Sequence, residues 1–249
     1  MRGIHIFCLT LCISAAWSKS INDKIIGGQD AKQGQFPYQV SWFHKSWSDT
    51  KFFWPICSGS IFDDQTIITT GHCCERMGGI GWENSQIIAG DLDFTRPSEF
   101  EQVREIKDYL IHPDYQHNAT SAKDDICLLL LDEPLEFNDN VQSIELDNHD
   151  PLDSTPCQVS GWGFQQVNDS SLTINTTILQ WTEVVVKSDS FCHAIHEDLY
   201  DSSTMICTAS PVSCIINEST LSLKYRSLIF REKMFVILTG VDHWYVMGN

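Results

Sequence analysis

Residues 67–74 read IITTGHCC, a β-branched apolar run that passes through one glycine into a histidine and two adjacent cysteines. The run is typical of a buried strand, so His72 is expected at the end of a strand. A histidine held this tightly serves either acid–base chemistry or metal ligation. The pattern favours acid–base chemistry, because three consecutive His, Cys and Cys side chains on an extended backbone point in different directions and do not easily converge on one tetrahedral ion.

The surrounding sequence predicts an all-β protein. Between residues 25 and 190, short runs rich in Val, Ile, Trp and Tyr are separated by Gly, Pro, Asn and Asp, which is typical of a sandwich or of barrels. Strands are expected at residues 38–42, 60–70, 86–89, 102–111, 126–131, 158–161 and 179–187. The one helix expected before residue 210 covers residues 191–200.

The first residues predict secretion. Residues 1–16 combine Arg2, a short apolar run and small residues at the end, in the order of a secretory signal peptide, and the apolar run is too short to span a bilayer. Removal of this segment leaves eight of the ten cysteines, which in an oxidising compartment indicates disulfides. Four sequons agree with an extracellular, glycosylated protein, at Asn118, Asn168, Asn175 and Asn217.

Charge argues against one class of partner and marks a boundary. The net charge of -17 argues against nucleic acid as a partner, because phosphate binding needs a positive footprint. Residues 25–210 carry 29 acidic and 9 basic side chains, whereas residues 211–249 carry 3 and 4. The last 39 residues also lack capping and turn signals, so they are expected to be an unrelated C-terminal tail.

The chain resembles the trypsin and chymotrypsin-like serine proteases (peptidase S1) in five places that occur in family order. These are KIIGG at residues 24–28, CSGS at 57–60 leading to TGHC at 70–73, LIHPDY at 110–115, DDICLL at 124–129 and CQVSGWG at 157–163. The resemblance implies two antiparallel six-stranded β-barrels, the first at about residues 25–140 and the second at about 141–210. It also implies a short activation propeptide at residues 17–24.

The resemblance assigns roles to particular residues. His72 matches the general base and Asp125 the buried carboxylate that orients the histidine ring. Cleavage after Lys24 would free the amino group of Ile25, which in the family organises the oxyanion hole. Polypeptide substrates or protein inhibitors are the partners that the family implies, and a folded chain is expected to be a monomer.

Three disulfides are expected. Cys57–Cys73 and Cys192–Cys207 follow from the resemblance. Cys74 and Cys127 lie outside the most familiar family pattern, but each is near a catalytic residue on segments that the fold brings together. We therefore expect them to bond to each other, the alternative being two unpaired buried thiols.

The family's Gly-Asp-Ser-Gly-Gly stretch occurs nowhere in the chain. If Cys214 is the cysteine that precedes it, Glu218 takes the nucleophile's place, and Ser219 follows one position late without the glycines of an oxyanion hole. The second barrel is expected to be incomplete, because its closing strands are also missing. The sequence therefore predicts a secreted serine endopeptidase by ancestry that is inactive as written, through an aberrant C-terminus. The alternative is a non-catalytic homologue that acts as a binding or regulatory module.

No cofactor is required by this interpretation. Asp91 and Glu101 lie where many relatives carry a calcium-binding loop, although a solvated acidic loop explains the same residues. His193 and His196 have the spacing of a helical metal pair, but two histidines on an exposed helix are the commoner case, and no metal site is predicted.

Overall fold

The computed structural model describes residues 28–44, 55–117, 122–147, 149–162, 165–166, 172–173, 177–196, 200–209 and 234–237. The strands up to residue 131 are β1 (Gln29–Asp30), β2 (Gln39–His44), β3 (Cys57–Ile61), β4 (Thr66–Thr69), β5 (Ser85–Ala89), β6 (Gln102–Ile111), β7 (Gln116–His117), β8 (Ala122–Lys123) and β9 (Cys127–Leu131). The later strands are β10 (Pro156–Gly161), β11 (Gln165–Gln166), β12 (Leu172–Thr173), β13 (Gln180–Lys187), β14 (Cys207–Ala209) and β15 (Met234–Ile237). The helices are α1 (Gly71–Ile80), α2 (Asp189–His196) and the 3-10 turn η2 (Trp82–Asn84). The expectation of a mostly β protein is confirmed.

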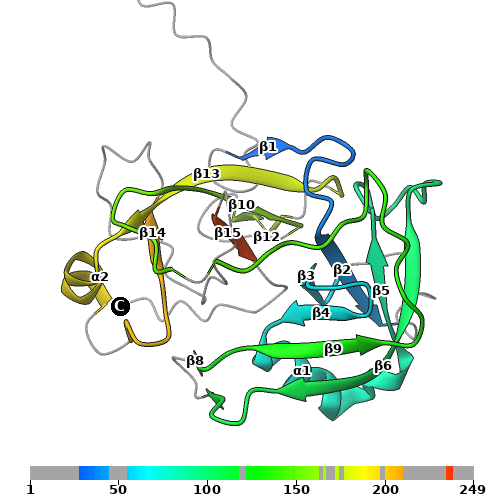
Figure 1. The fold of residues 1–249 in the computed structure, drawn as a ribbon, viewed down its shortest axis with the longest axis horizontal. Helices are drawn as coiled ribbons and strands as arrows, with labels where there is room; N and C mark the ends of the chain where they lie inside the picture. The colour runs from blue at the N-terminus through cyan, green and yellow to red at the C-terminus, as the bar shows by residue number, and fades with distance from the viewer. Residues whose placement is uncertain are drawn as a thin grey trace, which may run out of the picture.

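Six strands close into an antiparallel barrel in the order β2-β3-β4-β9-β6-β5 (Figure 1). Strand β9 shows how the strands contribute to the core: Cys127, Leu129 and Leu131 are buried, while Leu128 and Leu130 are partly exposed. This alternation with period two places one face of the strand in the barrel core. The first of the two expected barrels is therefore present.

Strand β2 is buried on both faces. Val40 and Trp42 belong to the core of the barrel. Ser41 and Gln39, on the other face, contact groups outside the barrel: the Ser41 hydroxyl donates to Asp91 at 3.1 Å, and Gln39 accepts a hydrogen bond from Ser160 of β10 at 2.8 Å. This face of β2 thus forms a polar contact between the barrel and the second sheet.

The second sheet has five strands in the order β1-β13-β10-β15, with β14 paired to β13. Strands β10 and β13 form its longest antiparallel pair, from Pro156 opposite Val185 to Gly161 opposite Gln180. The described residues form no second closed barrel. A hydrophobic cluster packs residues next to this sheet against segments that flank the barrel strands. Its members are Ala31, Phe36, Tyr38, Ile144, Trp162 and Leu179.

Strand β15 is the part of the expected C-terminal tail that the structure describes. It pairs in parallel with β10, with Met234 opposite Cys157 and Ile237 opposite Ser160. Figure 1 shows it between the barrel strands and the rest of the second sheet, and it also approaches β3. Residues 234–237 therefore add a strand to the second sheet.

Two local predictions are wrong. Residues 60–70 form not one strand but β3 and β4, because Asp63 accepts a hydrogen bond from the Gln65 amide at 3.0 Å and turns the chain. Helix α1, which carries His72, was expected as extended backbone. The one helix expected from the sequence is confirmed as α2, which spans Asp189–His196 in place of residues 191–200.

Helix α1 has little intrinsic tendency to form. Its N-cap Thr70 makes no side-chain capping bond, its first turn holds no acidic residue, and Gly78 and Gly79 lie inside it. Packing imposes the helix instead, because Met77 and the cysteines of its first turn are fully buried in the barrel core. Within the described part of the chain, no helix is long and apolar enough to cross a membrane.

Candidate active site

The site lies at the end of the barrel where β4 leads into α1. Strand β4 pairs with β9 so that Thr69 is opposite Cys127. His72 follows Thr69 by three residues, and Asp125 precedes Cys127 by two. The antiparallel register therefore brings the histidine of one segment to the aspartate of the other.

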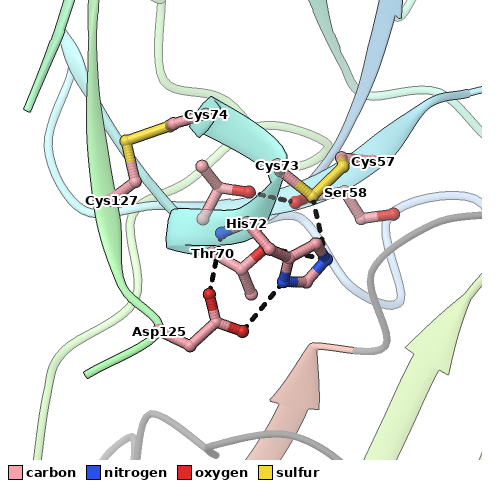
Figure 2. The surroundings of a disulfide bond; sticks show 9 residues. Cys57, Ser58, Thr70, His72, Cys73, Cys74, Asp125 and Cys127 are labelled. Atoms are coloured by element: carbon pink, nitrogen blue, oxygen red, sulfur yellow. Dashed lines mark hydrogen bonds and ion pairs between the residues drawn. A yellow bond between two sulfur atoms is a disulfide. The ribbon is translucent and has the colours of Figure 1, made fainter. Parts of the chain in front are cut away.

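Asp125 accepts two hydrogen bonds from His72. The ring Nδ1 lies 2.8 Å from Oδ2, and the backbone N–H donates to Oδ1 at 2.8 Å (Figure 2). Asp125 is 3% exposed and His72 is 9% exposed, so little water competes for either bond. With Nδ1–H held by the carboxylate, the neutral ring carries its lone pair on Nε2, which is the tautomer of a general base.

Asp125 also supports the helix on which His72 lies. Because Thr70 provides no side-chain cap, the His72 N–H in the first turn of α1 is satisfied by the Asp125 carboxylate. A negative charge at a helix N-terminus is favourable, since the first N–H groups have no partner within the helix. One carboxylate thus fixes both the ring and the backbone of His72.

The other ring nitrogen of His72, Nε2, lies 3.4 Å from Thr70 Oγ1 and 3.4 Å from Cys73 Sγ. Cys57, His72 and Cys73 form the one convergent group of three possible metal ligands among the described residues. Both sulfurs belong to a disulfide, however, and thiolates are the form of cysteine that ligates metals. The arrangement therefore suits proton transfer and not metal binding.

The structure forms three disulfides: Cys57–Cys73, Cys74–Cys127 and Cys192–Cys207. These are the three pairs expected from the sequence, including the one outside the familiar family pattern. Cys157 is buried and not disulfide-bonded, and burial raises the pKa of its thiol to about 11. Cys214, which the sequence offered as a possible partner for Cys157, lies outside the described residues.

There is a steric reason for a glycine at position 71, directly before His72. A Cβ on Gly71 would lie 2.7 Å from the ring of Tyr115, so only glycine allows this close approach. The Tyr115 hydroxyl donates to Glu75 of α1 at 2.9 Å. The stretch that ends at Tyr115 thus packs against the start of the histidine helix.

A family profile described as Trypsin matches residues 25–215. The chain belongs to the trypsin family. Trypsin-1 of Astacus astacus is 32% identical over 192 residues, 75% of each chain, and coagulation factor IX of Cavia porcellus is 32% identical over 193 residues. The match to factor IX covers 72% of this chain and 64% of that protein's length.

Trypsin V-A of Rattus norvegicus is 29% identical over 193 residues, with 78% of this chain and 70% of the relative covered. The solved structure of neuropsin, a serine protease expressed in the limbic system of mouse brain, aligns with a TM-score of 0.61 over 74% of each chain at 23% identity. This last likeness is one of fold.

Several positions that the sequence singled out lie outside the described residues. They are the activation bond at Lys24 and Ile25, the serine Ser219, and the sequons Asn118, Asn168, Asn175 and Asn217. The signal peptide at residues 1–16 and the propeptide at residues 17–24 lie outside them as well. The structure therefore describes the acid–base half of the expected site.

The acidic loop after β5 contains one buried carboxylate. Burial and, to a smaller extent, the charge of Glu101 raise the pKa of Asp91 to about 7. Its Oδ2 accepts the hydrogen bond from Ser41, while its Oδ1 has no hydrogen-bond partner. Burial also raises the pKa of Glu101. Oxygen ligands and an orphaned buried oxygen fit calcium, but these acids form no convergent group of three, so calcium at Asp91 and Glu101 stays a prediction.

The two histidines of α2 do not meet a third ligand in the described part of the chain. The ring of His193 packs edge-on against Tyr200, with 5.0 Å between the ring centroids. Burial lowers the pKa of His196. Both observations agree with a packing role.

One ion pair near the site was not foreseen. Lys123, two residues before Asp125, donates to Asp201 of the α2–β14 connection at 2.7 Å. Hydrogen bonds from Lys123 and Ser203 lower the pKa of Asp201 to about 2. The two partners lie far apart in the sequence and in no motif, so no sequence signal identifies the pair.

Proposed function

We propose that this chain is a secreted member of the serine-endopeptidase lineage that does not hydrolyse peptides in its present sequence. The buried His72–Asp125 pair, with both of its bonds at 2.8 Å, is the observation that supports descent from an acid–base catalyst. Such a pair takes a proton from an attacking hydroxyl and returns it to the leaving amine. Its action requires a nucleophile in front of Nε2.

The proposed inactivity rests on the residues after Cys207. The stretch from Thr208 to Ser219 contains no Gly-Asp-Ser-Gly-Gly, and Glu218 stands where the nucleophile is expected after Cys214. Ser219 has no glycine on either side. Glycines let the backbone come close enough to a substrate for its N–H groups to form an oxyanion hole, so this device is missing at Ser219. A proton acceptor without a hydroxyl and without oxyanion donors does not accelerate acyl transfer.

A second function is binding without cleavage, in which the chain engages polypeptides or protein inhibitors as a non-catalytic module. The complete first barrel favours it, because the His72–Asp125 pair and two of the three disulfides are assembled there. A monomer without nucleic-acid affinity is proposed in either case, in keeping with the net charge of -17.

The function is tested on the full chain secreted from a eukaryotic host. Immobilised trypsin cleaves the Lys24–Ile25 bond, N-terminal sequencing verifies the cut, and hydrolysis of a mixed peptide library is followed by mass spectrometry. We expect no cleavage above that of a matched His72→Ala variant. Cleavage that the His72→Ala variant loses would contradict the proposal.

Secretion and glycosylation are tested on the same material. We expect the secreted chain to begin between residues 16 and 20, and its mass to fall on treatment with an N-glycosidase. A chain that stays in the cell with residues 1–16 attached contradicts the proposed localisation.

A further inference from the structure

Two consecutive cysteines tie the first turn of α1 to two different strands. Cys73 bonds to Cys57 of β3, and Cys74 bonds to Cys127 of β9 (Figure 2). The second of these bonds joins the same two segments as the His72–Asp125 contact: Cys74 follows His72 by two residues, and Cys127 follows Asp125 by two. Among the described residues it is the one disulfide between α1, which carries His72, and β9, the strand that follows Asp125.

Neither partner of the His72–Asp125 contact is fixed by its own secondary structure. The helix begins without a side-chain cap and contains Gly78 and Gly79. Asp125 lies in a turn before β9, where Asp124 has a φ of 48° and the Ile126 amide donates to the Asp124 carbonyl at 2.8 Å. A non-glycine residue in the left-handed region carries strain, so this turn depends on its surroundings for its shape.

The Cys57–Cys73 bond cannot replace this link. It fixes the helix relative to β3, and β3 does not pair with β9 directly, because β4 lies between them in the barrel. The Cys74 and Cys127 residues are fully buried, at 0% and 1% exposure, so their bond lies in the barrel core. A cross-link there restricts the separation of the helix start from the start of β9.

We propose that the Cys74–Cys127 disulfide is a positioning device for the His72–Asp125 pair. It holds the first turn of α1 against the start of β9, so that one carboxylate meets both the ring Nδ1 and the backbone N–H of His72. The inference rests on the proposed role of this pair as an acid–base unit. Its test measures the contact itself and needs no catalytic activity, so its failure is distinguishable from failure of the proposed function.

The test measures hydrogen exchange of the His72 amide in the full chain. This amide donates to Asp125, so it exchanges when the contact opens, while the amides of β5 exchange when the barrel opens. The variant Cys74→Val/Cys127→Ala keeps the site apolar, and Cys192→Ala/Cys207→Ala is the matched control in the other region. The measured quantity is the exchange rate of the His72 amide divided by that of the β5 amides. We expect this ratio to be at least about tenfold higher in the first variant than in the unchanged chain, and to be unchanged in the control variant.

Equal acceleration of the His72 and β5 amides would overturn the proposal, since the disulfide would then contribute only to overall stability. The unchanged chain gives an independent test if the first variant does not fold. There we expect the His72 amide to be protected as strongly as the β5 amides. A His72 amide that exchanges much faster than the β5 amides in the unchanged chain, with its three disulfides intact, would also overturn the proposal.

Discussion

The closed barrel and the second sheet differ in how their backbone edges are satisfied. Every strand of the barrel, from β2 round to β5, pairs with two neighbours, and the inward-facing side chains of the barrel form one hydrophobic cluster. The second sheet has β1 and β15 at its ends, and β15 reaches it as a parallel strand from the far end of the chain. The two regions share a family and an all-β composition, but only one is closed in the described residues.

This difference separates the two halves of the expected chemistry. The barrel carries His72, Asp125 and two disulfides, all with buried side chains and defined partners. The second sheet carries the third disulfide and the buried thiol of Cys157. The proton-relay pair thus lies in a region that folds around it, while the segment expected to carry the nucleophile lies outside the described residues.

The largest expected effect comes from the disulfides. Removing Cys74–Cys127, which closes a separation of 53 residues, should lower the free energy of unfolding by about 4 kcal/mol in urea denaturation. Removing Cys192–Cys207, with a separation of 15, should cost about 3 kcal/mol. A larger loss from the second pair would break the comparison, because it would place the main constraint in the second sheet.

The junction of the two regions should depend on pH through Asp91. Its pKa is raised from 3.8 to about 7 in the folded chain, so its contribution to stability is complete below pH 4 and is lost as the pH rises through 7. An Asp91→Asn variant has no carboxyl group to titrate at this position, so it does not lose this stability. The free energy of unfolding of the variant minus that of the unchanged chain, measured without calcium, should rise by about 3 kcal/mol between pH 5 and pH 8.

The control for Asp91→Asn is Glu99→Gln, which removes the charge of an exposed acid in the same loop. If the loop binds calcium, the ion should raise the melting temperature of the unchanged chain at pH 8 and have a much smaller effect on Asp91→Asn. An identical calcium response in both proteins counts against the predicted site.

Matched valines compare the packing of the two regions. Val40→Ala in the barrel, where Val40 is 0% exposed, should lower the free energy of unfolding by about 2 kcal/mol. Val159→Ala in β10, where Val159 is 4% exposed in a sheet that the described residues do not close into a barrel, should cost about 1 kcal/mol. Equal losses in thermal denaturation would show that the second sheet is packed as tightly as the barrel.

A pair of aspartates includes the smallest effect. Asp125→Asn weakens both bonds to His72 and should cost about 2 kcal/mol, because a buried charge-assisted acceptor is lost. Asp201→Asn removes a solvent-screened contact with Lys123 and should cost less than about 1 kcal/mol. The contribution of the Asp201 carboxylate to stability should vanish as the pH falls towards its pKa of about 2. A loss of unfolding free energy in Asp201→Asn as large as that in Asp125→Asn would contradict this ranking.

Regular strands could be predicted from the sequence because burial follows their period. Residues 102–111 were expected as a strand and form β6, and residues 126–131 were expected where β9 spans Cys127–Leu131. The pairing of His72 with Asp125 came from the family resemblance, since nothing local to either residue specifies a partner 53 positions away.

The remaining features depend on tertiary contacts. Helix α1 forms despite Gly78 and Gly79, because its cysteines and Met77 are buried in a barrel whose closure no local pattern encodes. Strand β15 is a short apolar run without a clear period, and its parallel partner β10 lies far back in the chain. The Lys123–Asp201 pair also joins two segments that the sequence does not relate.

The central claim is that the chain retains a buried proton relay and lacks a serine nucleophile for it to serve. The most direct measurement treats the full chain with immobilised trypsin, adds a fluorophosphonate probe, and reads the intact mass beside that of the His72→Ala variant. The account predicts no covalent adduct on either protein. A single serine adduct on the unchanged chain that disappears in His72→Ala would contradict it.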